Sequence, residues 1–222
     1  MKLKRILALA LSGVMAVGVL TACNFGGGSS GGNKVSDSTN AVRSALNSQL
    51  DTLGQDTVDF TGNGGLASAT RTVARGVTEN DFTGLNFSGT TNGAVVPENS
   101  ALADFMSRYI NYDHWTGGFT SYTPTGNFTG DKTFVTLMLF DGAMSATGVG
   151  QAVANNVAVW NLKNVSSKDY TFEGHVAAYQ VTIPATTAGS SSSSSGSDTS
   201  VWVVGLMLEQ TQVQSTSSST AP

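Results

Sequence analysis

The sequence predicts an α+β domain in which helices pack on the faces of a mixed or antiparallel sheet. Two apolar runs, residues 134–140 (FVTLMLF) and 201–208 (VWVVGLML), have no polar side and are typical of central strands covered on both faces. Three other segments repeat apolar residues at the spacing of amphipathic helices. In chain order, N-terminal helices precede a β-α-β-β unit, and this order indicates an α+β fold.

Each expected helix combines an apolar stripe with a residue suited to begin its first turn. A weaker helix is expected over residues 66–77. The stripes and their start candidates are Val42, Leu46, Leu50 and Leu53 after Asp37 or Ser38; Leu102, Phe105, Met106, Tyr109 and Ile110 after Pro97 or Asn99; and Val149, Val153, Val157 and Trp160 after Asp141 or Ser145.

A third strand is expected over residues 170–183, where apolar and polar residues alternate imperfectly and Gly174 suggests a bulge. Central strands that are apolar on both sides need cover on both faces. We therefore expect the N-terminal helices to pack on one face and the helix over residues 145–160 to pack on the other.

The N-terminus has the features of an export signal. Basic residues within the first five positions precede an uncharged, mostly apolar stretch over residues 6–20, which is shorter than the roughly 20 residues that span a bilayer. Residues 20–23 (LTAC) follow, and they resemble the lipobox of bacterial lipoproteins at all four positions. The resemblance implies cleavage before Cys23, acylation of Cys23, and a mature protein held on the extracytoplasmic side of the cell membrane or outer envelope. An uncleaved anchor or a simple secreted protein is the alternative.

These features divide the chain into a signal peptide (1–22), a lipidated cysteine with a Gly/Ser tether (23–36), one α+β domain (37–213) and a Ser/Thr-rich tail (214–222). A Ser-rich loop over residues 189–198 lies inside the domain, between two expected strands. Such a loop can join a hairpin because the entropy of closure grows slowly with length.

Charge and cysteine content restrict the partners of the mature chain. Once residues 1–22 are removed, eight of the eleven basic residues remain against 15 acidic ones, a formal charge of −7. Nucleic acid is therefore not an expected partner, and the bilayer is expected to be contacted only through the lipid on Cys23. Because Cys23 is the single cysteine, the domain has no disulfide and must be stabilised by its buried core.

An aromatic cluster is the main candidate for ligand binding. Tyr109, Tyr112, His114, Trp115, Phe119 and Tyr122 lie close together in the sequence. Aromatic faces stack on sugar rings and apolar ligands, and we expect Tyr112, Trp115 and Tyr122 to be the exposed members that bind. Ordinary burial in the core is the alternative, because Tyr109 lies on an apolar helical stripe and tryptophan is commonly a core residue.

The chain shows no motif for a catalytic or cofactor site. Residues 148–153 (GVGQAV) follow a strand and enter a helix, but Val153 occupies the third glycine position of the dinucleotide fingerprint. Flexibility at the start of the helix explains these glycines better than dinucleotide binding does. Glu173 and His175 would lie on one face of a strand, as two metal ligands or an acid/base pair. A zinc site needs three or four ligands, so no metal or cofactor is predicted.

Together these observations favour a lipid-anchored, noncatalytic extracytoplasmic module that binds an envelope glycan or protein. An envelope glycan or peptide hydrolase is an alternative, with Asp113, His114, Glu173 or His175 as acid/base groups. A small solute-capture lipoprotein is the third possibility, although two lobes of ordinary domain size would need a longer chain.

Overall fold

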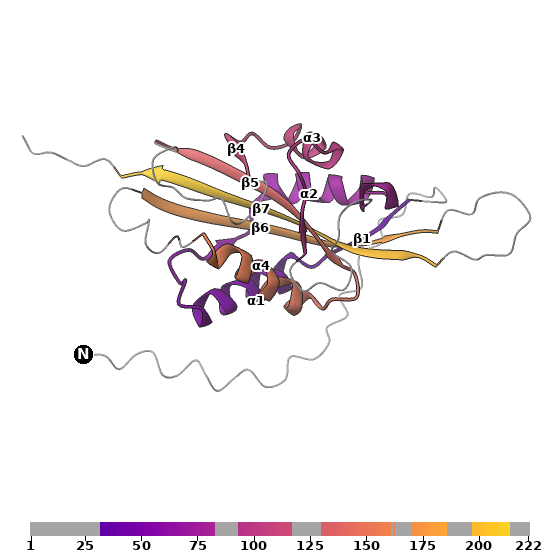
Figure 1. Ribbon diagram of the computed structural model, residues 1–222, viewed down its shortest axis with the longest axis horizontal. Helices are drawn as coiled ribbons and strands as arrows, with labels where there is room; N and C mark the ends of the chain where they lie inside the picture. Colours follow the sequence, from indigo (N-terminus) through magenta and orange to yellow (C-terminus); the bar gives the residue numbers. More distant parts are fainter. Residues whose placement is uncertain are drawn as a thin grey trace, which may run out of the picture.

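The computed structural model describes residues 32–82, 93–116, 130–160, 162, 170–185 and 197–213. In this part of the chain, one sheet lies between two layers of helices, which confirms the α+β class (Figure 1). The elements are β1 (Lys34–Asp37), α1 (Thr39–Thr52), β2 (Phe60–Thr61), α2 (Gly64–Gly76), the 3₁₀ helix η1 (Glu79–Phe82), β3 (Ala94–Val95), α3 (Ala101–Ser107), β4 (His114–Trp115), β5 (Lys132–Asp141), α4 (Ala146–Ala158), β6 (Tyr170–Ile183) and β7 (Thr199–Gln212).

The three long strands form the centre of the sheet, in the spatial order β6-β7-β5. The middle strand β7 is antiparallel to both of its neighbours, and β6 and β7 pair without interruption from Tyr170 opposite Gln212 to Ile183 opposite Thr199. Four short strands complete the edges. On the outer edge of β6 lie β1, antiparallel, and β2, parallel; on the outer edge of β5 lie β3, antiparallel, and β4, parallel. The sheet is therefore mixed, which is one of the two forms, mixed or antiparallel, that the sequence predicts.

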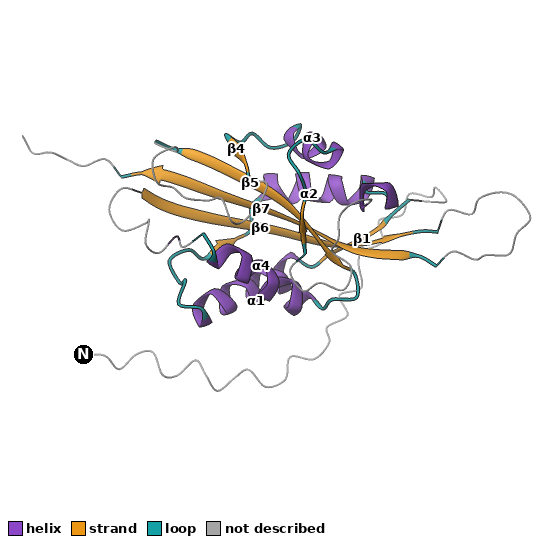
Figure 2. Ribbon diagram, in the orientation of Figure 1, coloured by secondary structure: helices purple, strands orange, loops and turns teal. Residues whose placement is uncertain are grey.

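Helices cover both faces, but not in the expected combination (Figure 2). Below the sheet in Figure 1, α1 packs beside α4, and both contribute to one buried cluster with alternate residues of the long strands. Above the sheet, α2 and α3 contribute to the second cluster. The expectation that α1 lies opposite α4 is wrong. The two helices form a pair because close contact at Gly150 lets them pack side by side on one face.

The strand pattern explains why both clusters are fully apolar. Along β5, Phe134, Met138 and Phe140 face α1 and α4, whereas residues 135, 137 and 139 face α2 and α3. All six are at most 2 % exposed. Side chains of a strand alternate between its faces, so an apolar residue at nearly every position is what a strand between two helical layers requires.

At the starts of α2, α3 and α4, a side-chain oxygen accepts a hydrogen bond from a backbone amide, whereas Ser38, the N-cap of α1, makes no such bond. Ser145 caps α4 by accepting from Gly148 N at 3.1 Å, and Ser100, rather than Pro97 or Asn99, caps α3. The expected helix over residues 66–77 is α2, which Asn63 caps through Leu66 N. Each cap satisfies an amide that has no partner within the helix.

Two residues of the predicted apolar stripes lie at the surface. Leu53 is 41 % exposed and follows the end of α1, and Tyr109 is 51 % exposed and follows the end of α3. Their expected burial is wrong, although Ile110, which also lies beyond the end of α3, is buried as expected. Tyr109 instead packs against the partly buried ring of Phe105, with 5.6 Å between the ring centroids.

Gly174 does not form a bulge, because the pairing of β6 with β7 passes through it without a shift in register. The glycine instead permits a close approach on the other edge of β6. A Cβ atom at Gly174 would lie 2.9 Å from Val58 Cγ1 and 3.0 Å from the ring of Phe60. The missing side chain therefore allows β2 to pair with β6 at this position.

Thr70 in α2 carries a buried hydroxyl that has no hydrogen-bond partner among the described residues. Its Oγ1 points at Gly205, where a Cβ atom would lie only 2.2 Å away. A buried unsatisfied hydroxyl costs about 1–3 kcal/mol, so replacing it with an isosteric methyl should stabilise the fold. We expect Thr70→Val to raise the free energy of unfolding by about 1 kcal/mol in urea denaturation.

Thr72→Val on the same helix provides the matched control, because its hydroxyl already donates to Ser68 O at 2.7 Å. This change should leave stability within about 0.5 kcal/mol of the wild type. A loss of stability in Thr70→Val would show that the Thr70 hydroxyl has a favourable partner.

The N-terminal residues 1–31, the Ser-rich loop over 189–196 and the tail over 214–222 lie outside the described residues. Residues 34–36, which the sequence assigned to the tether, belong to β1 and pair with β6. Among the helices that the structure describes, none is long and apolar enough to cross a bilayer.

Candidate functional site

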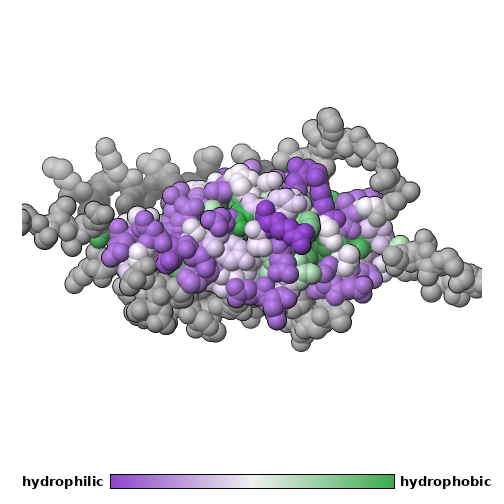
Figure 3. Space-filling view, turned by 90° about the horizontal axis from the view of Figure 1, so that it is seen from above, coloured by the Kyte–Doolittle hydropathy of each residue, from purple (hydrophilic) through white to green (hydrophobic). Residues whose placement is uncertain are grey.

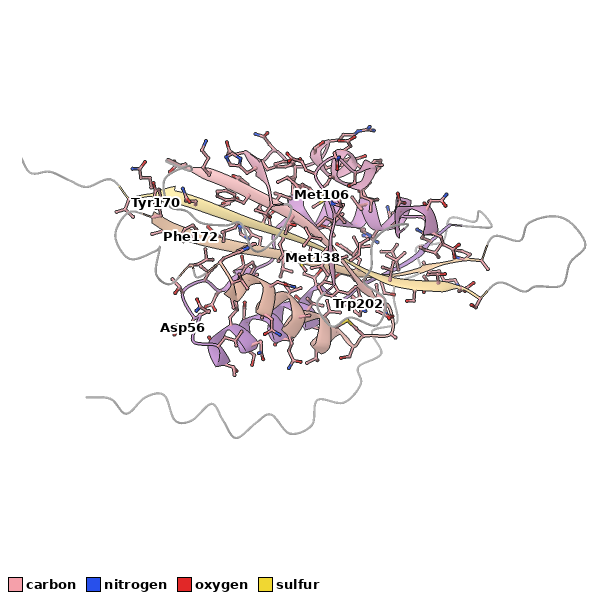
Figure 4. All side chains as sticks on the ribbon, viewed as in Figure 1. Asp56, Met106, Met138, Tyr170, Phe172 and Trp202 are labelled. Carbon is pink, nitrogen blue, oxygen red and sulfur yellow. The ribbon has the colours of Figure 1, made fainter. Side chains whose placement is uncertain are left out.

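The candidate site lies at the end of the sheet where β6 begins and β7 ends. There the long strands extend beyond the helices that cover their centre (Figure 1). Tyr170 and Phe172 mark this end of β6 in Figure 4. Phe172 packs against the cluster formed by α1 and α4, so the next residue, Glu173, faces the side of α2 and α3.

Strand register brings three potential ligands together at this end. Glu173 of β6 lies directly opposite Glu209 of β7, and His175 lies two residues along β6 on the same face. One oxygen of each glutamate and one ring nitrogen of His175 lie within 4.8 Å of one another. In the described part of the chain, this is the one group of three or more His, Cys, Asp or Glu residues close enough to hold a metal ion. We call it the EHE cluster.

His175 is the buried member of the EHE cluster. The residue is 5 % exposed and lies opposite Met207, which is also 5 % exposed. Its Nδ1 lies 2.9 Å from Thr61 Oγ1, at hydrogen-bonding distance. Its Nε2 lies 3.8 Å from Glu173 Oε1, which is beyond hydrogen-bonding distance. The ring is therefore oriented through one nitrogen, while the other faces the glutamates.

The orienting Thr61 is held in place by α1. Asn47 accepts a hydrogen bond from Phe60 N and donates one to Phe60 O, both at 2.9 Å, so its amide pairs with β2 as another strand would. On its other edge, β2 pairs in parallel with β6, with Thr61 beside His175. The bare backbone of Gly174 makes this approach possible. Three elements thus determine where the histidine ring lies.

Among the described residues, no lysine or arginine balances the carboxylates of the EHE cluster. In the described ranges, neither Glu173 nor Glu209 forms an ion pair with a lysine or arginine. Carboxylates directly opposite on neighbouring strands repel each other, and such a pair destabilises a sheet. Water partly screens the repulsion, because the Glu173 side chain is 66 % exposed. The arrangement is one in which a bound cation would be stabilising.

The second histidine does not join this cluster. His114 on β4 stacks on Phe134, with 5.5 Å between ring centroids, and Phe134 belongs to the cluster on the α1 and α4 side. The carboxylate of Asp113 accepts a hydrogen bond from Thr133 N at 2.8 Å and lies 3.6 Å from Lys132 Nζ. The hydrogen bond from Thr133, with a smaller contribution from Lys132, lowers the pKa of Asp113. These contacts give Asp113 a structural role at the start of β5.

The three expected ligand-binding aromatics have different environments. Trp115 is only 7 % exposed, and its Nε1 donates to Val96 O at 2.9 Å, so its expected exposure is wrong. The indole packs inward because Trp115 shares the buried face of β5 on which α2 and α3 pack. Tyr112 is half-buried and tilted against Trp115. Burial of the Tyr112 side chain raises its pKa, and the negative charges of Glu98 and Asp104 raise it further. Tyr122 lies outside the described residues.

The surface over α2 and α3 is predominantly hydrophilic, with only small separate hydrophobic areas on the visible described residues (Figure 3). Two open hollows flank η1. One, of about 370 Å³, is lined by Asn33, by residues 77–80 and by residues 183–184, and the other, of about 240 Å³, lies between η1 and the start of α3. Neither is lined by a histidine, and neither includes the EHE cluster.

Comparison with protein-family models, curated proteins and solved structures finds no significant match for this chain.

Proposed function

We propose that this protein is a lipid-anchored, extracytoplasmic, noncatalytic binding module, held at the cell membrane or outer envelope through acyl chains on Cys23. The observation that carries the proposal is residues 20–23 (LTAC) behind a basic and then apolar N-terminal segment. A single acyl chain binds membranes only marginally, whereas two or three chains, as the lipoprotein resemblance implies, hold a protein stably.

The start of the folded domain is consistent with such an anchor. Asn33 donates a side-chain hydrogen bond to Val77 O at 2.6 Å, and β1 begins at the next residue. Nine residues therefore separate Cys23 from the first described tertiary contact of a side chain. A Gly/Ser chain of this length spans about 15–18 Å. The domain would thus be held close to the lipid surface, where an envelope glycan or protein is within reach.

Binding rather than hydrolysis is favoured because, among the described residues, Asp113 and His114 do not join Glu173 and His175 in one group. The hydrolase alternative uses Asp113, His114, Glu173 or His175 as acid/base groups, and convergence of all four would strengthen it. His114 faces the α1 and α4 side, whereas the EHE cluster faces the α2 and α3 side. Solute capture by two lobes is not favoured either, because the described residues form one sheet with a helical layer on each face. Tyr112, with its half-buried ring, stays a proposed contact for a ligand.

The anchoring proposal is tested by replacing the acylated atom. We expect Cys23→Ser to abolish incorporation of radiolabelled palmitate and to move the protein from the membrane pellet to the soluble fraction or to leave it as an unprocessed precursor. The reason is that a serine hydroxyl does not replace the sulfur to which the lipid is attached. Metabolic labelling followed by fractionation measures both effects.

Ala22→Gly is the matched control, because it keeps a small residue before Cys23 and should retain labelling and membrane association. Wild-type protein without palmitate label, or a Cys23→Ser variant that is processed and still sediments with vesicles, would contradict the anchor.

A further inference from the structure

We propose that the EHE cluster is a binding site for one divalent transition-metal cation, held by His175 Nε2 and by carboxylate oxygens of Glu173 and Glu209. The proposal does not depend on lipid anchoring, because all three residues belong to the folded sheet.

The histidine supplies the first argument. His175 is more than nine-tenths buried, and its Nε2 faces the two glutamates without a hydrogen-bond partner in the described part of the chain. A metal-binding histidine commonly has its second ring nitrogen hydrogen-bonded to an outer group that fixes the ring. Thr61 is placed to do this. When the Thr61 hydroxyl accepts from Nδ1–H, it can donate toward Gly174 O at 3.4 Å, and Nε2 then presents a lone pair.

The two glutamates supply the second argument. Register fixes Glu173 and Glu209 directly opposite each other, where their charges repel. A dication between them would convert this repulsion into attraction. Ligand atoms around a tetrahedral zinc lie roughly 3.4 Å apart, for bonds of 2.0–2.2 Å. The present separations, up to 4.8 Å, can shorten by rotation of the exposed Glu173 side chain.

The ligand set indicates the class of metal. One imidazole nitrogen with two carboxylates suits Zn²⁺, Mn²⁺ or Fe²⁺, whereas Ca²⁺ and Mg²⁺ prefer oxygen ligands alone. Soft ions such as Cu⁺ prefer sulfur, and no thiolate belongs to the site. Three protein ligands leave at least one coordination position for water or for an atom of a partner. A metal bound here would therefore also offer a binding position at the surface.

Titration of the full-length chain with Zn²⁺ tests the proposal. Every protein in the series carries Cys23→Ser and no polyhistidine tag, so that neither a thiol nor added histidines bind metal. Isothermal titration calorimetry should show one site per chain in this background. Glu173→Gln, Glu209→Gln and His175→Ala should each weaken Zn²⁺ binding by more than about tenfold, and Thr61→Val, which removes an outer-shell contact, by about 10–100-fold.

His114→Ala is the matched control, since His114 is the only other histidine in the chain and faces away from the cluster. It should leave Zn²⁺ affinity unchanged. Co²⁺ titration should give visible ligand-field absorption that His175→Ala alters and His114→Ala does not. Ca²⁺ and Mg²⁺ at the same concentrations should not compete with Zn²⁺.

The melting temperature with and without Zn²⁺ distinguishes metal binding by the two glutamates from a purely structural role of these residues. Without metal, Glu173→Gln and Glu209→Gln should raise the melting temperature, because each removes the like-charge pair. With Zn²⁺ in excess, the wild type should gain in melting temperature and both variants should lose most of that gain. Both glutamine variants keep the size of the side chain, so they report on binding even if His175→Ala fails to fold.

The proposal would be overturned if the Cys23→Ser chain bound no Zn²⁺, Mn²⁺ or Fe²⁺, or if the two glutamine variants bound them as well as their parent. Preference for Ca²⁺ over Zn²⁺ would overturn the assigned role of His175. None of these outcomes bears on palmitate labelling, so failure of the metal site and failure of the anchor are distinguishable.

Discussion

Trp115→Ala is expected to lower the free energy of unfolding by about 3–5 kcal/mol, the range for removal of a large aromatic side chain from a core. The indole is 7 % exposed and belongs to the cluster beneath α2 and α3. Its Nε1 donates to Val96 O at 2.9 Å, and the ring contacts Tyr112 with 5.8 Å between centroids. The variant therefore loses buried apolar area and leaves the carbonyl of Val96 without its donor.

Urea denaturation monitored by far-ultraviolet circular dichroism measures this effect. Trp115→Phe separates its two parts, because phenylalanine retains most of the packing but not the hydrogen bond. It should cost about 1–3 kcal/mol less than the alanine change does. Tyr109→Ala is the exposed control, since Tyr109 is 51 % exposed and lies in the same region. A loss below about 1 kcal/mol in Trp115→Ala would contradict the burial of the indole.

The effect matters for any test of ligand binding by the aromatic cluster. Because Trp115 supports the fold, loss of a ligand in Trp115→Ala would not distinguish a missing contact from an altered surface. Tyr112→Phe is a sounder probe of binding, since it keeps the ring that packs on Trp115 and removes only the hydroxyl.

The long strands and helices were predictable because each has a pattern of its own. Residues 134–140 and 201–208 are apolar on both faces, and the structure places them in the central strands β5 and β7. The short strands were not predictable, because β2 and β4 contain only two residues each and have no periodicity. Tertiary contacts hold them: Asn47 of α1 pairs with the backbone of Phe60 in β2, and Asp113, which precedes β4, accepts a hydrogen bond from Thr133 N of β5.

The candidate site was predictable only within one strand. The spacing of Glu173 and His175 places them on one face of β6, and this much follows from strand geometry. Glu209 comes 34 positions after His175 in the chain, and its place beside Glu173 and His175 depends on the register of β6 with β7. A shift of one residue would have turned Glu209 to the opposite face. Thr61 was missed for the same reason, since β2 reaches His175 only through tertiary contacts.

Gly150→Ala is expected to lower the free energy of unfolding by about 1–3 kcal/mol, the usual penalty for overpacking a core. At this position α4 lies directly against α1. A Cβ atom at Gly150 would be 2.5 Å from Val42 O and 2.7 Å from Ala45 Cβ, and the first of these is backbone that cannot rotate away. Within a helix, alanine is more stable than glycine by about 1 kcal/mol, so the clash must outweigh this gain for the free energy of unfolding to fall.

Gly148→Ala is the matched control, two residues earlier in the same helix. A Cβ atom there would lie 3.4 Å from Ser145 Oγ and 3.7 Å from Met144 Cε, which are ordinary contacts. The same substitution should therefore leave stability unchanged or raise it by up to about 1 kcal/mol. Opposite signs for the two variants in urea denaturation would establish that Gly150 serves helix packing. If both variants were stabilised, α1 and α4 would have to lie farther apart than described. The glycine pair at the start of α4 would then need another explanation, and helix-start flexibility would regain support.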